Sequence, residues 1–236
     1  MSRSLVFIPG WCLGRGPLEF VVQSLAGEFI DLPGYRDAPR CVDFSEAVQR
    51  IATALPASCA LAGWSIGAQL ALAVAARYPQ KVSRLLLVAG TASFVQREAW
   101  PQAMAPETLA EFSAAFAEDP ASMLPRFVGG FNRGDAQAKE VTRRILASAD
   151  PLPSKTILAD GLAWLRDLDL RAEAATIRVP TLLIHGAADP LMPLPAAQAL
   201  TALIPGAQLQ VLSDCAHAPF LSQPEIFLEH ARAFLA

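Results

Sequence analysis

Short apolar runs alternate along this chain with longer segments in which apolar residues recur every three or four positions. A short apolar run predicts a buried strand, and the recurring spacing predicts a helix with one apolar face. The helical spacing is clearest at Phe44, Val48, Ile51 and Leu55. The predicted strands cover residues 5–8, 28–32, 84–89, 179–185 and 207–212, and one more runs from Ala60 into Gly63. The predicted helices cover residues 17–26, 44–55, 194–203 and 224–235, and one more follows Gly67.

The order of these elements predicts an α/β fold. Strands that alternate with helices over short connections form a mostly parallel, doubly wound sheet. The alternation stops after the strand at residues 84–89, and helical patterns then follow at residues 106–116, 120–128, 136–148 and 158–168. We therefore expect residues 1–92 and 176–236 to form the core. Residues 93–175 are expected to form a helical cap over the carboxyl edge of the sheet, where a cap excludes water and shapes substrate choice.

The composition indicates one well-buried domain. Of the 236 residues, 53% are hydrophobic and 17% are charged, which excludes a disordered chain. No apolar run reaches the length of a membrane span, and the N-terminal segment leads directly into a strand, so we expect no secretory signal. The net charge of −3 favours neither nucleic acid nor an anionic membrane as a partner. The expected protein is a soluble cytoplasmic monomer.

The cysteine pattern and the remaining motifs argue against metal and cofactor chemistry. The four cysteines are scattered without Cys-x-x-Cys spacing, which is typical of reduced thiols and not of a disulfide framework or a zinc site. No His, Cys and Asp residues show ligand spacing, and there is neither a P-loop nor a Gly-x-Gly-x-x-Gly turn. We expect no metal and no cofactor.

The sequence Gly63-Trp64-Ser65-Ile66-Gly67 lies between a predicted strand and a predicted helix. Gly-x-Ser-x-Gly in this context is the pattern of a nucleophile elbow, a sharp turn that exposes a serine hydroxyl at the carboxyl end of a strand. The strained backbone of such a turn requires very small flanking residues. The pattern predicts Ser65 as a nucleophile and the amide of Ile66, at the helix N-terminus, as a donor to an oxyanion.

A second oxyanion donor is expected from the turn after the first strand. Residues 9–14 read Pro-Gly-Trp-Cys-Leu-Gly, and hydrolases with a nucleophile elbow place a backbone amide from an early strand-to-helix turn next to the nucleophile. Trp11 is the predicted donor. An ordinary strand-to-helix turn with a packing tryptophan is the alternative.

A serine nucleophile needs a histidine base, which in turn needs a carboxylate to orient it. His217 lies on a loop after the last predicted strand, whereas His230 falls within the final helix and His185 ends a strand, where it is expected to hold the following turn. Asp189 follows a buried strand at the same edge of the sheet, and the order Ser, Asp, His fits this kind of fold. Asp214 is the competing acid, although its closeness to His217 favours a turn-forming role.

Several stretches of the chain together resemble a known family. They are Pro9-Gly10-Trp11, Asp31-Leu32-Pro33-Gly34, the elbow, Glu98-Ala99-Trp100-Pro101, Gly161-Leu162, Asp169-Leu170-Arg171 and Ala216-His217-Ala218-Pro219-Phe220. The chain is similar in these stretches to the BioH-type esterases of the α/β-hydrolase superfamily, which are pimeloyl-[acyl-carrier protein] methyl ester carboxylesterases of biotin synthesis. The resemblance spans nearly the whole chain and implies an α/β-hydrolase fold with Ser65, Asp189 and His217 as the triad.

The same resemblance implies roles for the cap. Residues that would line the acyl channel are Phe127, Val128, Gly129, Gly130 and Phe131. Basic cap residues would contact an acidic carrier protein, and those in the matching segment are Arg126, Arg133, Lys139, Arg143 and Arg144. Residues 126–144 carry five basic and two acidic side chains, a net charge of +3 that would steer an acidic partner. A solvated helix face is the alternative for these charges.

The expected function is hydrolysis of the methyl ester of a pimeloyl group on acyl-carrier protein. A broad-specificity short-chain carboxylesterase or thioesterase without a carrier partner is the first alternative. A ligand receptor that has kept a hydrolase fold is the second.

Overall fold

The computed structural model describes residues 4–41 and 43–236, so residues 1–3 and Val42 of the predicted core lie outside the described residues. Within them, six strands form one sheet in the order β2-β1-β3-β4-β5-β6, and all neighbouring pairs are parallel. The expected parallel sheet is therefore confirmed. The strands are β1 (Leu5–Ile8), β2 (Gly27–Phe29), β3 (Cys59–Trp64), β4 (Val82–Val88), β5 (Thr181–Gly186) and β6 (Gln208–Leu212).

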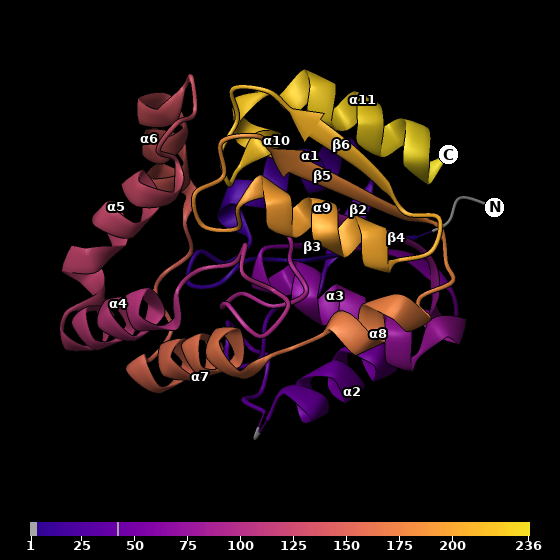
Figure 1. Cartoon of the computed structure of the whole chain (residues 1–236), viewed down its shortest axis with the longest axis horizontal. Helices are drawn as coiled ribbons and strands as arrows, with labels where there is room; N and C mark the ends of the chain where they lie inside the picture. Colours follow the sequence, from indigo (N-terminus) through magenta and orange to yellow (C-terminus); the bar gives the residue numbers. More distant parts are fainter. Residues whose placement is uncertain (1–3, 42) are drawn as a thin grey trace.

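Helices cover both faces of the sheet (Figure 1). One face carries α1 (Glu19–Ser24) and α11 (Pro224–Leu235), which contact each other. The other face carries α2 (Phe44–Ala54), α3 (Ile66–Arg77), α8 (Arg171–Thr176) and α9 (Leu194–Leu203). The doubly wound arrangement predicted from the alternation of patterns is confirmed.

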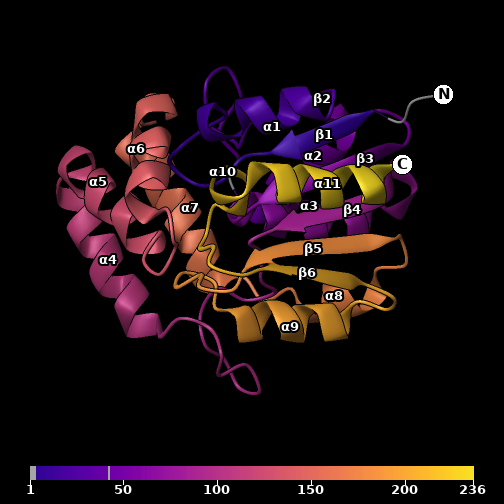
Figure 2. The ribbon, with the colours of Figure 1, turned by 90° about the horizontal axis from the view of Figure 1, so that it is seen from above.

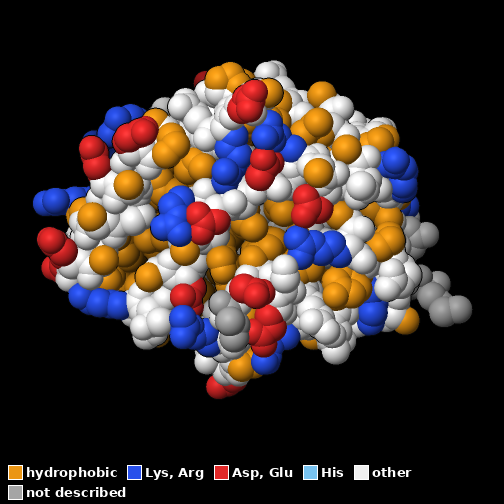
Figure 3. Space-filling model, turned by 60° about the horizontal axis from the view of Figure 1, so that its bottom comes forward, with side chains coloured by type: hydrophobic (Ala, Val, Ile, Leu, Met, Phe, Trp, Pro, Cys, Tyr) orange, Lys and Arg blue, Asp and Glu red, His pale blue; other side chains and the backbone are white. Residues whose placement is uncertain are grey.

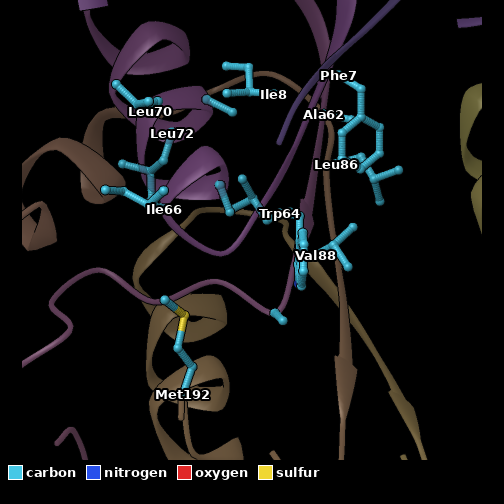
Figure 4. Packing of buried hydrophobic residues seen from close by; sticks show 14 of the residues in the cluster. Phe7, Ile8, Ala62, Trp64, Ile66, Leu70, Leu72, Leu86, Val88 and Met192 are labelled. Atoms are coloured by element: carbon cyan, nitrogen blue, oxygen red, sulfur yellow. The ribbon is translucent and has the colours of Figure 1, made fainter. Parts of the chain in front are cut away.

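The central layer packs through rows of side chains that cross the strands. Phe7, Ala62 and Leu86 are register partners on β1, β3 and β4, and they lie side by side in Figure 4. All three are buried, as is every residue of β3. Because β3 and α3 occupy the middle of the molecule, the turn that joins them is fixed by packing from both sides. Ser65 lies in that turn.

The residues between β4 and β5 are mainly helical. They form α4 (Pro106–Glu118), α5 (Pro120–Phe131), α6 (Ala138–Ser148) and α7 (Lys155–Asp167), which gather at one end of the sheet (Figures 1 and 2). Helix α8 instead contacts α3 and α9 beside the sheet. The division into a core and a cap at residues 93–175 stays a prediction, and we use the word cap below for α4 to α7.

Some element boundaries differ from the predicted ones. Helix α7 begins at Lys155 rather than at residue 158, because the hydroxyl of Ser154 accepts a hydrogen bond from the Ile157 amide and caps the helix. The short helix α8 and the four-residue α10 (Pro219–Ser222) were not predicted, since so few residues show no periodicity. Among the described residues, no helix has both the length and the apolar character to cross a bilayer.

Candidate active site

Ser65 occupies a strained turn between β3 and α3. Its backbone has φ 59° and ψ −122°, in the left-handed half of the Ramachandran map that a side chain rarely adopts. A Cβ at Gly63 would collide with the carbonyl oxygen of Gly67, and a Cβ at Gly67 would collide with the carbonyl oxygens of Ile8 and Pro9. Glycine is therefore required at both flanking positions, and the turn holds the serine in one orientation.

His217 and Asp189 come together across loops that follow β6 and β5. With Nδ1 of His217 protonated, it donates a hydrogen bond of 2.7 Å to Oδ2 of Asp189. The other carboxylate oxygen, Oδ1, accepts from the amides of Leu191 and Met192 at 2.9 and 3.0 Å. This arrangement leaves Nε2 of His217 as the ring nitrogen that can accept a proton. Both side chains are buried.

The surroundings of Asp189 keep its carboxylate ionised. Burial raises its pKa, but the electrostatic interaction with His217, the hydrogen bond from His217, the electrostatic interaction with His185 and the amide of Met192 outweigh that effect. The pKa of Asp189 is therefore below its usual value. A fixed negative charge at this position orients the imidazole and stabilises its protonated form.

His185 holds the turn after β5, as the sequence predicted. With Nε2 protonated, it donates to the carbonyl oxygen of Met192 at 2.7 Å and lies 3.6 Å from Oδ2 of Asp189. Its Nδ1 is buried without a hydrogen-bond partner among the described residues. Burial, the main cause, lowers the pKa of His185, against the opposing effect of Asp189. The ring is therefore neutral in the folded protein.

This neutral histidine makes stability depend on pH. The unfolded chain takes up a proton at His185 near pH 6.5, whereas the folded chain resists doing so. Stability should therefore fall as the pH drops below about 6.5. In urea unfolding between pH 7.5 and 5.5, His185→Gln is expected to be less stable than the wild type at pH 7.5, and the difference should narrow towards pH 5.5. Parallel curves for the two proteins would show that His185 does not carry this dependence.

Ser65 and His217 line the same cavity, which has a volume of about 140 Å³. The His217 ring packs against both Trp64 and Phe131, with ring centroids 5.7 and 5.2 Å away. Apart from Ser65, Thr108 and His217, the cavity is lined by Gly10 and by side chains that are predominantly apolar. These are Trp11, Leu13, Trp64, Phe94, Met104, Leu109, Phe112, Phe127, Phe131, Leu162, Leu165 and Leu191.

The residues expected in an acyl channel separate into two groups. Phe127 and Phe131 line the cavity, one helical turn apart on α5. Val128, Gly129 and Gly130 are not among the lining residues, because Val128 is buried elsewhere and a Cβ at either glycine would meet no atom within 4 Å. The aromatic face of α5 therefore lines the cavity, and its glycines face away.

The loop expected to provide an oxyanion donor lies against the elbow. Trp11 lines the cavity beside Ser65, and the preceding carbonyls of Ile8 and Pro9 approach Gly67 closely. The next amide, that of Cys12, donates to the hydroxyl of Tyr35 at 2.9 Å. The amide of Ile66 opens α3, where the helix dipole favours negative charge. Both predicted amides therefore belong to backbone segments that border Ser65.

Asp135 has a role that the sequence analysis did not find, since it was counted there only as a charge. Its Oδ2 accepts from the amide of Ala216 at 3.0 Å, next to His217, and its Oδ1 accepts from the hydroxyl of Ser222 at 2.9 Å and the amide of Gln137 at 2.7 Å. The cap thus ties down the loop that carries His217. No local sequence signal marks this contact, because its partners lie far along the chain.

The basic residues of the cap differ in whether their side chains have a partner within the protein. Arg143 forms a two-pronged ion pair with Glu140, with hydrogen bonds of 2.9 and 2.6 Å, and Arg144 donates to the carbonyl oxygen of Leu221. Within the described residues, Arg126, Arg133 and Lys139 are exposed and form no ion pair. With Arg143 paired to Glu140 and the carboxylate of Asp135 directed inward, these three side chains are the exposed cations of residues 126–144 without an ion pair in the described structure.

The face that carries α2, α4 and α7 shows a different pattern. Acidic and basic side chains are interspersed there, with hydrophobic surface between them (Figure 3). Ion pairs on this side include Arg40 with Asp160 and Arg166 with Asp167. Such balanced pairs do not attract a partner of one sign.

The cysteines do not contribute to the chemistry of the site. Cys12 follows Trp11 in the loop and Cys215 precedes His217 by two residues, but both are buried. Burial raises the pKa of Cys12 and, as the main cause, raises that of Cys215 to about 11. Both thiols therefore lack the access and the ionisation that a reactive cysteine needs.

Comparison with known proteins places this geometry in context. The alpha/beta hydrolase family matches residues 5–230. The pimeloyl-[acyl-carrier protein] methyl ester esterase of Aromatoleum aromaticum is 38% identical over 238 residues, covering 95% of each chain. The protein of the same name from Nitrosomonas europaea is 36% identical over 234 residues, covering 95% of this chain and 92% of its own.

One longer protein and one solved structure are also similar to this chain. The biotin biosynthesis bifunctional protein BioHC of Teredinibacter turnerae is 32% identical over 251 residues, and this chain spans 44% of its length. Among solved structures, an esterase (EaEST) from Exiguobacterium antarcticum superposes with a TM-score of 0.85 at 24% identity, covering 99% of this chain and 91% of that chain. The last similarity shows a shared fold.

Proposed function

Because this chain belongs to the alpha/beta hydrolase family, we propose that it hydrolyses the methyl ester of pimeloyl-[acyl-carrier protein] to the free acid and methanol. Relatives with that named activity match nearly its whole length. The observation that carries the proposal is the buried hydrogen bond between His217 and Asp189, together with the position of His217 in the same apolar cavity as Ser65. We also propose that the protein acts as a monomer in the cytoplasm.

In the first step, the oxygen of Ser65 attacks the ester carbonyl carbon, and its proton passes to Nε2 of His217. The amides of Trp11 and Ile66 donate to the oxyanion that forms. The tetrahedral intermediate collapses, the bond to the methoxy oxygen breaks, and His217 gives its proton to that oxygen so that methanol leaves. The product is an acyl-enzyme on Ser65, with His217 neutral again.

In the second step, a water molecule replaces methanol. His217 takes a proton from the water as its oxygen attacks the acyl carbon, and the same two amides hold the second oxyanion. The bond to the Ser65 oxygen then breaks, and that oxygen recovers a proton from His217. The free carboxylic acid leaves and the enzyme returns to its starting state. Asp189 stays ionised throughout and holds the imidazole in place.

The shape of the site suits an acyl chain that enters with its ester end first. The cavity walls are apolar except at Ser65, Thr108 and His217, so methylene groups can be buried without leaving polar protein groups unpaired. A carrier protein is far too large for a cavity of about 140 Å³ and would remain outside. The exposed cations Arg126, Arg133 and Lys139 lie on the cap, where they would attract an acidic carrier.

The carrier part of the proposal is tested by reversing these cations. Replacing Arg126, Arg133 and Lys139 together with glutamate should raise KM for the carrier-bound methyl ester at least tenfold at low salt, with kcat unchanged. KM for a free short-chain methyl ester should not change. Arg143→Glu is a poorer choice because it would place a second carboxylate beside Glu140. Arg178→Glu, an exposed cation close to β5, is the matched control.

The outcomes separate the alternatives. Release of methanol from the carrier-bound ester by the wild type supports the proposed reaction, and its absence together with hydrolysis of free esters indicates a carboxylesterase without a carrier. An unchanged KM in the triple variant would show that these cations do not dock the carrier. A protein that turns over no ester would be a receptor with a hydrolase fold.

A further inference from the structure

The side chain of Trp11 is held by helix α7 of the cap. Its indole Nε1–H donates a buried hydrogen bond of 3.0 Å to the carbonyl oxygen of Leu158. Gly161, almost one turn further along α7, lies directly against the same ring. A Cβ at this position would be 2.5 Å from Cδ1 and 2.8 Å from Nε1 of the indole. Helix α7 therefore fixes both the direction and the depth of the Trp11 side chain.

Two other cap helices surround the same ring. The ring centroids of Phe112 and Phe116 on α4 lie 6.0 and 4.8 Å from that of Trp11, and the centroid of Phe127 on α5 lies 5.4 Å away. The Trp11 residue is only 5% exposed. Three of the four cap helices thus meet on one side chain that belongs to the loop after β1.

The backbone of this residue borders the reacting serine. The carbonyls of Ile8 and Pro9 approach Gly67 of the elbow, and the Cys12 amide that follows Trp11 is fixed by the Tyr35 hydroxyl. Cys12 itself has φ 60°, so the loop is tightly turned at this point. Gly10 packs against the Trp64 ring and the Cys12 amide is held by Tyr35, so an indole shift that the side-chain torsions cannot absorb is passed to the Trp11 peptide unit, whose amide is the proposed oxyanion donor.

We propose that the cap positions the oxyanion donor through the Trp11 indole, with the Leu158 carbonyl and Gly161 of α7 as positioning groups. The inference rests on the proposed function, since it says which groups position an oxyanion donor of the same site. A cap that moves away from the core would break the bond to Leu158 and release the Trp11 amide. Ester hydrolysis is then efficient only with the cap in the position seen here.

The first test is Trp11→Phe, which keeps an aromatic ring and removes the indole donor. Complete removal of an oxyanion donor costs about 10²–10³ in kcat, and a displaced donor costs less. We expect kcat to fall about tenfold for a free short-chain methyl ester, with KM within about twofold of the wild type. Trp164→Phe, a partly buried tryptophan on the same helix, is the matched control and should keep the wild-type kcat.

An inhibitor distinguishes a misplaced oxyanion donor from a general loosening of the site. The boron atom of butylboronic acid bonds to a serine oxygen and becomes tetrahedral. One of its hydroxyl groups then lies in the oxyanion hole. If the indole positions the Trp11 amide, the affinity of Trp11→Phe for this inhibitor should fall by the same factor as kcat/KM. Unchanged inhibitor affinity in the folded variant would contradict the proposal.

Gly161→Ala provides a second variant that removes no atom from Trp11. Its methyl group must push the indole aside, so kcat should fall in the same way. The losses of kcat in Trp11→Phe and Gly161→Ala should be less than additive when the two changes are combined, because both act through one contact. Thermal unfolding identifies which variants fold, and the folded ones are compared. A wild-type kcat in either folded variant would overturn the proposal, whereas a wild type without esterase activity would refute the proposed function instead.

Discussion

Replacing Ser65 with alanine is expected to abolish ester hydrolysis and to leave the fold unchanged. In enzymes that use a Ser-His-Asp triad, loss of the serine lowers kcat on the order of 10⁶-fold, because the acyl-enzyme route is no longer open. Alanine keeps the Cβ, so the strain at φ 59° stays as it is in the wild type. Methanol release from the methyl ester, followed over many turnovers, measures the loss, and thermal unfolding checks the fold.

A matched control separates this effect from the general loss of a hydroxyl. Ser148 is exposed on α6, and its hydroxyl donates only to carbonyl oxygens within its own helix. Ser148→Ala should therefore retain the wild-type kcat and KM. More than about 1% of wild-type activity in Ser65→Ala, from a preparation free of other esterases, would rule out Ser65 as the nucleophile.

Much of this fold was predictable because its signals are local. The central strands are mostly buried and contain short apolar runs, and their alternation with helices indicates a parallel sheet. The elbow is equally local, since Gly63 and Gly67 are required by collisions within one turn and the adjacent loop. The resemblance to the esterase family is confirmed by relatives that cover nearly the whole chain.

The convergence of Asp189 with His217 was predictable for a geometric reason. Both residues follow strands of a parallel sheet, and the carboxyl ends of such strands meet at one edge. This reasoning predicts that the two side chains meet. It does not give the hydrogen-bond length of 2.7 Å or the other partners of the carboxylate, which only the structure shows. Their catalytic roles stay a prediction until variants are measured.

The cap was predicted less well, and helix geometry explains why. Assigning all of residues 127–131 to the channel ignores that consecutive side chains of a helix point in different directions, and that those three or four positions apart share a face. Phe127 and Phe131 satisfy that spacing and line the cavity, whereas the intervening residues point elsewhere. The role of Asp135 was out of reach for a different reason, since its bond to the Ala216 amide joins residues 81 positions apart.

The net charge of residues 126–144 also says little about which charges face the solvent. Five basic and two acidic residues give a net charge of +3, but the sequence does not tell which charges are consumed internally. The structure pairs Arg143 with Glu140 and directs Asp135 inward. Fewer exposed cations are therefore unpaired than the count suggests, which narrows the set of residues worth mutating.

Asp189→Asn is the second change with a very large expected effect. Oδ1 of Asp189 already accepts from the amides of Leu191 and Met192, so an asparagine would keep its oxygen there and turn its amide nitrogen towards His217. That nitrogen is a donor, so Nδ1 of His217 would have to accept and the proton would move to Nε2. A histidine protonated at Nε2 cannot take the proton of Ser65. We expect kcat to fall about 10⁴-fold, as for the corresponding change in a serine protease.

The competing acid provides the control for this variant. Asp214 is exposed, has φ 58°, a conformation that asparagine also tolerates, and offers its backbone carbonyl to the amide of Ala136. Asp214→Asn should therefore keep both stability and kcat. If Asp214→Asn instead lost activity while Asp189→Asn stayed active, the orienting acid would have to be reassigned. The imidazole NMR signal of His217 should report the change of tautomer in Asp189→Asn directly, because the bond that holds Nδ1–H in the wild type is absent.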